Sequence, residues 1–158
     1  YIFPRNQVNR EHLEILKSEG FNSYRGTEES IIFRSSNIIA RIFRMLDTVL
    51  KISGDNIYNI KGSNNGLLNI PSSRLLRPIT KYKYINTWRF HRIAYGMRKA
   101  AKLGMVYHLW WHPHNFGNDV DGNLRNLRLI LEEFKKLNRN FDFESLNMSN
   151  LGKSIRND

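Results

Sequence analysis

Short apolar segments with strand character alternate with longer segments of helical periodicity along this chain, and this alternation is the strongest constraint on its fold. The expected order is strand 1–3, helix 9–20, strand 21–25, helix 35–52, irregular segment 67–79, helix 87–103, strand 105–111, loop 112–122 and a helix from 123. Strands that alternate with helices predict an α/β fold, with a parallel sheet and outer helices. Because a closed barrel of this type needs about eight strands, the chain is expected to form a small open sheet or part of a larger barrel. Its 158 residues predict a single domain, 1–158.

The ends of the helices carry recognisable signals. The expected N-caps, whose side chains can accept a hydrogen bond from the first helical turn, are Asn9, Thr87 and Asn123. Glycines that favour helix termination follow two of the helices, Gly20 and Gly104. The apolar stripe expected on the last helix is Leu124, Leu127, Leu131 and Phe134. The Asn- and Gly-rich segment 54–66 predicts a loop with few packing residues, and the C-terminus is expected to be a turn.

The positive charge of the chain is concentrated in its middle third. The net charge is +11, and no acidic residue lies between Asp55 and Asp119. The ten basic residues of that stretch are Lys61, Arg74, Arg77, Lys81, Lys83, Arg89, Arg92, Arg98, Lys99 and Lys102. Such a segment forms either a binding surface for a polyanion or a solvated basic face. Nucleic acid is not the expected partner because no nucleic-acid motif or interleaved aromatic pattern is present.

The sequence HLWWHPHNFG, residues 108–117, has an unusual density of histidine and tryptophan. In a strand, alternate side chains share a face, so His108, Trp110 and His112 are expected on one face and Trp111 on the other. In parallel α/β sheets, reactive groups gather just beyond the carboxyl ends of the strands, where His112 is expected. Pro113 favours an extended backbone at His112. An imidazole held there is suited to general acid or base catalysis, although a structural histidine is the alternative.

Metal sites are not predicted from the spacing of ligands alone. His112 and His114 resemble a pair of metal ligands, but two ligands do not complete a site. Asp119 and Asp121 resemble the start of a calcium-binding loop, yet Ile130 stands where that loop needs glutamate. The chain has no cysteine, which excludes disulfides and cysteine-ligated metal. No apolar run approaches the roughly 20 residues of a membrane-spanning helix, so no membrane span is expected.

Three blocks of the sequence resemble the C-terminal half of polysaccharide deacetylases, the NodB-type enzymes of carbohydrate esterase family four. The blocks are FPRNQVNREHLEILKSEGFNSYRG at 3–26, LLNIPSSRLLRP at 67–78, and HLWWHPHNFG at 108–117 followed by NLRNLRLILEEF. The resemblance spans roughly 3–148 and implies that the chain is the C-terminal part of an irregular (β/α) barrel. The implied reaction is metal-dependent hydrolysis of acetyl groups from N-acetylated oligo- or polysaccharides.

The resemblance assigns roles to individual residues. His112 occupies the position of the family's general acid, which protonates the leaving amine, and Trp110 replaces the usual leucine of that motif. Arg5 matches the arginine that orients the catalytic base, although it is displaced past Pro4. The substrate-binding candidates around the motif are Trp110, Trp111, His114 and Asn115.

The family's metal ligands and base belong to its N-terminal half, and nothing in 1–158 matches them. The resemblance therefore implies that a divalent metal, often zinc, is held by a missing N-terminal half of the barrel, and that this segment is inactive by itself. Two alternatives remain open. The chain is a binding module that uses its basic segment for a polyanion, or it is a catalytically inactive relative that holds glycan on its tryptophans.

Overall fold

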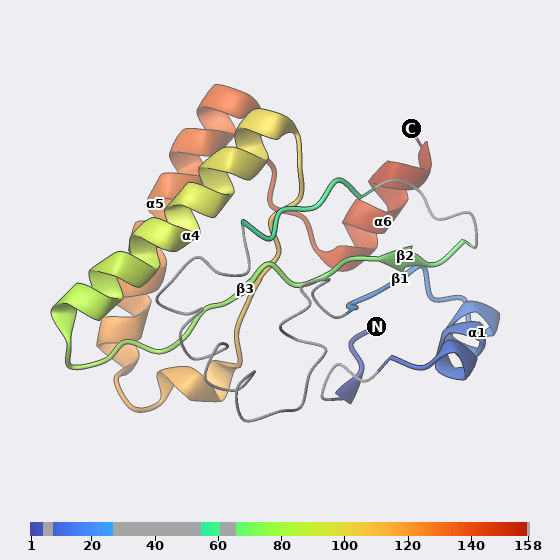
Figure 1. Cartoon of the computed structure of the whole chain (residues 1–158), viewed down its shortest axis with the longest axis horizontal. Coiled ribbons are helices and arrows are strands. Elements are labelled where there is room, and N and C mark those ends of the chain that lie inside the picture. The colour runs from blue at the N-terminus through green and yellow to red at the C-terminus, as the bar shows by residue number, and fades with distance from the viewer. Residues whose placement is uncertain (5–7, 27–54, 61–65, 158) are drawn as a thin grey trace.

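The computed structural model describes residues 1–4, 8–26, 55–60 and 66–157 (Figure 1). The expected helix at 35–52 lies outside these ranges. The elements within them are α1 (Arg10–Ser18), β1 (Ser23–Tyr24), β2 (Leu68–Asn69), β3 (Arg74–Leu75), α4 (Lys83–Leu103), β4 (Leu109–Trp110), the 3₁₀ helix η2 (Pro113–Phe116), α5 (Val120–Phe141) and α6 (Met148–Asn157).

Every described strand pair is parallel. β1 pairs with β2, with Ser23 opposite Leu68, and β3 pairs with β4, with Arg74 opposite Leu109. Since β2 and β3 belong to one extended stretch, the two pairs run in the same direction (Figure 1). The described part of the chain thus consists of helices and short parallel strands. The described strands form no closed barrel, and membership of a larger barrel stays a prediction.

The segment 67–79 was expected to be irregular because it contains two prolines, but it supplies β2 and β3, one strand of each pair. Its prolines fall outside both strands, where no sheet hydrogen bond from their nitrogen is needed. The backbone nitrogens of Leu68 and Ile70 donate to the carbonyls of Asn22 and Tyr24. The nitrogen of Leu76 donates to the carbonyl of Trp110 at 2.8 Å. Within the expected strand at 105–111, Leu109–Trp110 pairs with β3 and Val106 forms an isolated bridge with Tyr58.

The expected loop at 54–66 is also more ordered than predicted in its described part, 55–60. Tyr58 forms an antiparallel bridge with Val106, and its hydroxyl donates to the carbonyl of Ser72 at 3.2 Å. Asp55 forms an ion pair with Lys99 on α4. These partners lie far away in the sequence, so the local composition carried no sign of them.

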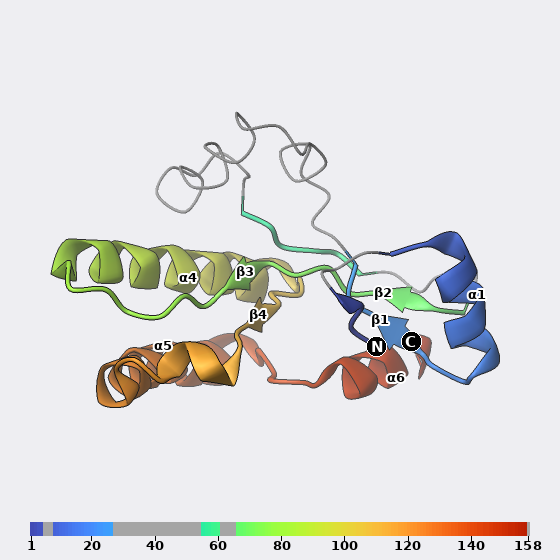
Figure 2. The same ribbon diagram turned by 90° about the horizontal axis from the view of Figure 1, so that it is seen from below.

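The helices α4 and α5 form a helical pair that contains the larger core (Figure 1). Seen from below, β4 lies between the levels of the two helices (Figure 2). The buried residues of this core are Leu76, Ile93, Met97, Ala101, Ile130 and Leu137. On α5, Leu127 and Phe134 pack against the core as expected, but Leu124 and Leu131 are exposed. The buried stripe is therefore shifted around the helix from the one predicted.

The starts of both helices differ from prediction. α4 begins at Lys83 rather than at Thr87, because the side chain of Asn86 exchanges hydrogen bonds with the backbone of Thr80 and holds the preceding turn. α5 begins at Val120, and Asp119 is its N-cap, accepting from the nitrogen of Gly122 at 2.8 Å.

Asn123 is a buried residue of α5 and not a cap. Its side-chain oxygen accepts from the nitrogen of Ile79 at 2.8 Å, and its amide donates to the carbonyl of Asp119 at 2.7 Å. These bonds tie the helix to the segment after β3, and an amide side chain with such partners can be fully buried.

A second, smaller core lies at the opposite end of the molecule, beside α1 (Figure 1). It contains Phe3, Leu16 and Leu67. The predicted start and end of α1 are confirmed, since Asn9 is its N-cap and Gly20 has the positive φ of 77° that follows it. The C-terminus forms the helix α6 instead of the expected turn, and the hydroxyl of Ser23 contacts it by donating to the carbonyl of Met148 at 3.3 Å.

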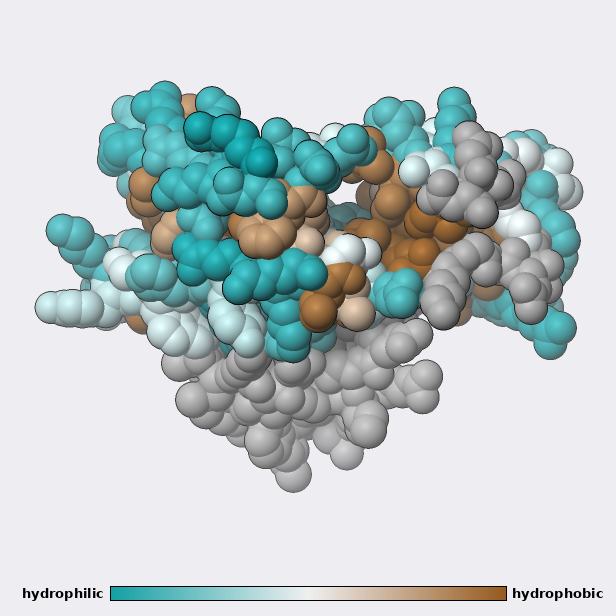
Figure 3. All heavy atoms as spheres, turned by 90° about the horizontal axis from the view of Figure 1, so that it is seen from above, coloured by the Kyte–Doolittle hydropathy of each residue, from teal (hydrophilic) through white to brown (hydrophobic). Residues whose placement is uncertain are grey.

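The visible surface of the helical pair is mostly hydrophilic in the view from above (Figure 3). No helix in the described part of the chain is long and apolar enough to cross a membrane.

Candidate functional site

The carboxyl ends of β1 and β4 bring an arginine, a tryptophan and two histidines into one row. The guanidinium carbon of Arg25 lies 4.3 Å from the ring centre of Trp110. The rings of Trp110 and His112 meet edge to face at 5.2 Å, and those of His112 and His114 stack at 5.1 Å. We call Arg25, Trp110, His112 and His114 the strand-end row.

The backbone explains where His112 lies. β4 ends at Trp110, and His112 follows with an extended backbone, φ −98° and ψ 130°, as the cap of η2. This conformation confirms the prediction from Pro113, whose ring disfavours a helical backbone at the preceding residue. The carbonyl of His112 accepts from the nitrogen of Asn115 at 3.0 Å. The side chain of His112 is exposed, so solvent and a ligand have access to its ring.

Alternation along the strand also separates the two tryptophans as predicted. Trp110 lies with Arg25 and His112, whereas Trp111 stacks on Phe116 at 6.1 Å. The ring nitrogen of Trp110 is buried and has no hydrogen-bond partner in the described part of the chain. One face of Trp110 is covered by Arg25, so a sugar has less of that ring available than of Trp111, which is 39% exposed.

Arg25 is the residue of this row to which the sequence assigned no role. It is 7% exposed and follows β1 directly, and burial lowers the pKa of its guanidinium. A desolvated guanidinium over an indole ring contributes about 2 kcal/mol through the cation–π interaction. Its stacking on Trp110 links β1 to β4, two strands that do not pair with each other.

His108 lies two residues before Trp110 on the chain and bonds to the segment between β2 and β3. Its backbone nitrogen donates to the hydroxyl of Ser73 at 2.8 Å, and its ring Nδ1 lies 3.2 Å from the carbonyl oxygen of Pro71. Burial lowers the pKa of His108, its bonds to the carbonyls of Ile70 and Pro71 oppose that shift, and the charge of Arg25 lowers the pKa further. A neutral His108 donates from Nδ1 to these carbonyls. We therefore assign His108 a structural role. The sequence predicted only that it shares a strand face with Trp110.

The other candidates are placed as follows. Arg5 lies outside the described residues. His114 is exposed in η2, and Asn115 is half-buried beside it. No group of three or more His, Asp or Glu side chains in the described ranges converges to hold a metal ion. The described residues therefore do not fit a metal site, and we assign no metal-dependent step to them.

Comparisons with known proteins found no matching family model, no matching curated protein and no matching solved structure.

Proposed function

We propose that this chain supplies the general-acid side of a carbohydrate deacetylase site, with His112 as the acid. The observation that carries the proposal is the position of His112, an exposed imidazole just beyond the carboxyl end of a parallel strand, held by an extended backbone. The sequence resemblance assigns the same residue to the same role. The substrate would be an N-acetylated oligo- or polysaccharide.

The proposed step is a proton transfer. When water adds to the acetyl carbon, it loses one proton to the base that the resemblance places in the N-terminal half. The carbon–nitrogen bond then breaks, acetic acid leaves with the oxygen of water and ionises in solvent, and the amine nitrogen takes a proton. His112 in its protonated form donates that proton. Trp110 and His114 flank its ring at 5.2 and 5.1 Å and limit its rotation, which positions the donor.

The first prediction concerns acetate release by the full-length protein that carries this chain. Assayed on N-acetylglucosamine oligomers with added Zn²⁺, His112→Gln is expected to lower kcat/KM by about a hundredfold or more, because general acids contribute that much. His12→Gln is the matched control, since His12 is an exposed histidine on α1. Its turnover is expected to equal that of the unaltered protein.

The pH profile separates catalysis from a structural effect. A general acid must be protonated, so the activity of the unaltered protein should fall on the alkaline side, and this limb should vanish in His112→Gln. Normal turnover by His112→Gln would refute the assignment. A full-length protein that binds the oligomers and releases no acetate would instead support a catalytically inactive glycan-binding relative.

A further inference from the structure

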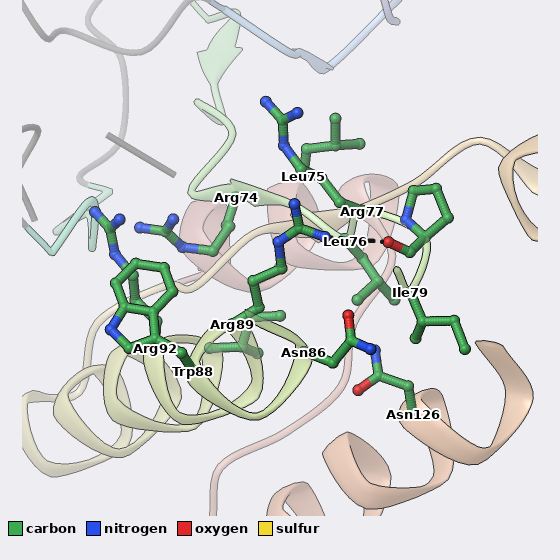
Figure 4. A pocket seen from close by; sticks show the side chains of 12 residues that line it. Arg74, Leu75, Leu76, Arg77, Ile79, Asn86, Trp88, Arg89, Arg92 and Asn126 are labelled. Atoms are coloured by element: carbon green, nitrogen blue, oxygen red, sulfur yellow. Dashed lines mark hydrogen bonds between the residues drawn. The ribbon is translucent and has the colours of Figure 1, made fainter. Parts of the chain in front are cut away.

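Four arginine side chains gather over the first half of α4, in an arginine pocket that no residue of the strand-end row lines (Figure 4). Arg74 comes from β3 and Arg77 follows that strand, while Arg89 and Arg92 are three residues apart on α4. Residues with this spacing share a helix face. Figure 4 shows Arg74, Arg89 and Arg92 on the same side of α4.

Around the narrow part of this pocket, Arg74 and Arg77 have no negatively charged partner among the described residues. None of the residues that line it is acidic. Within the described ranges, the guanidinium groups of Arg74 and Arg77 form no ion pair and no hydrogen bond. Arg89 donates to the carbonyl of Pro78 at 3.2 Å, which brings no negative charge.

The two neighbouring arginines also disfavour each other's charge. Burial lowers the pKa of Arg89, and the positive charge of Arg77 lowers it further. Two like charges that repel each other are stabilised when an anion lies between them. A bound anion would therefore be stabilised by the same charges that destabilise the empty pocket.

The shape of the pocket indicates a ligand larger than a single ion. The narrow part, with a volume of about 30 Å³, opens beside a wider hollow of about 330 Å³. The two share Arg74, Trp88 and Arg92, and the guanidinium carbon of Arg92 lies 5.3 Å from the ring centre of Trp88. The wider hollow is also lined by Tyr95 and by Asp55, whose carboxylate is paired with Lys99. Aromatic side chains of this kind cover the apolar or ring portion of a small molecule.

We propose that the arginine pocket binds a small molecule through a phosphate or sulfate group, with the rest of the ligand beside Trp88. A phosphate group carries about two negative charges at neutral pH and three acceptor oxygens, which matches several guanidinium groups from different directions. A carboxylate has one charge and two oxygens and satisfies fewer of them. This site is independent of the proposed acetyl hydrolysis at His112.

The test is calorimetric titration of the full chain at low ionic strength with inorganic phosphate, glucose 6-phosphate and glucose. The variant is Arg74→Gln with Arg77→Gln, because neither guanidinium has a partner that folding would lose in the described structure. The control is Arg125→Gln with Arg128→Gln, two exposed arginines of α5 outside the pocket, which removes the same charge.

Glucose 6-phosphate is expected to bind, and the pocket variant is expected to weaken it about tenfold or more, since charge-assisted hydrogen bonds to phosphate are lost. The control variant is expected to stay within about twofold of the unaltered chain. Tighter binding of glucose 6-phosphate than of phosphate would assign the site to a phosphorylated sugar, and equal binding to a free anion.

Several outcomes would overturn the proposal. One is equal loss in both double variants, which would mean that net charge alone attracts the ligand. Another is no binding of any of these anions by the folded chain, checked by circular dichroism. Binding of long polyanions alone, such as heparin or nucleic acid, would point to an extended basic face instead of a pocket.

Discussion

The helical pair and the strand-end row are built in different ways from the same chain. The core of the helical pair is made by apolar residues that recur along α4 and α5, with Leu76 inserted from the segment after β3. The strand-end row joins two distant segments, with Arg25 after β1 and the residues Trp110, His112 and His114 at and after the end of β4. The first region is held by buried apolar surface, and the second by specific polar and ring contacts.

This difference determines what each region tolerates. Apolar contacts are non-directional, so the stability of a helical core follows from the volume that fills it. A buried polar group needs its own partner, and its removal exposes the partner's unsatisfied atom. We therefore expect the helical pair to respond to lost volume, and His108, which precedes the strand-end row on the chain, to respond to protonation.

The largest effect is expected at Leu76, which is 2% exposed in the core of the helical pair. Leu76→Ala should lower the free energy of unfolding by about 2–5 kcal/mol, through lost burial and the cavity left behind. Leu131→Ala, at an exposed position of α5, is the control and should change it by about 0.5 kcal/mol or less. Urea unfolding measures both, and equal losses would contradict the assigned core.

A smaller effect is expected at Asn123, the polar tie within the helical pair. Asn123→Ala leaves the backbone nitrogen of Ile79 without its acceptor, at a cost of about 1–3 kcal/mol. Asn140→Ala, at an exposed position of the same helix, controls for helix propensity and should not destabilise the protein. A neutral result at Asn123 in urea unfolding would show that this tie is replaced by water.

The smallest effect is expected at His108 and depends on pH. Because folding lowers the pKa of His108 below its ordinary 6.5, stability is fully present above that value and is lost as the pH falls below it. His108→Asn keeps a donor near the Nδ1 position but does not titrate. The unfolding free energy of this variant should therefore fall less than that of the unaltered protein between about pH 7 and about pH 5. The difference between the two slopes should correspond to at most about one bound proton. Identical slopes in the two proteins would disprove the buried, neutral His108.

The sequence predicted the features that depend on a few neighbouring residues. Asn9, Gly20 and Gly104 mark helix ends as expected, because capping and left-handed backbone are local preferences. The extended backbone of His112 followed from Pro113 in the same way. The parallel pairing of β3 with β4 agrees with the order of elements, since α4 lies between them and returns the chain before the second strand begins.

The tertiary structure alone decided which distant residues meet. Asn123 looked like a cap in the sequence, but its side chain bonds to Ile79 across 44 residues. The pairing of Arg25 with Trp110 and the gathering of four arginines over α4 depend equally on how β1, β3 and α4 are placed. Periodicity and dihedral preferences act over one or two turns of chain. Contacts between elements depend on how the two cores pack, and a pattern within a single element does not contain that information.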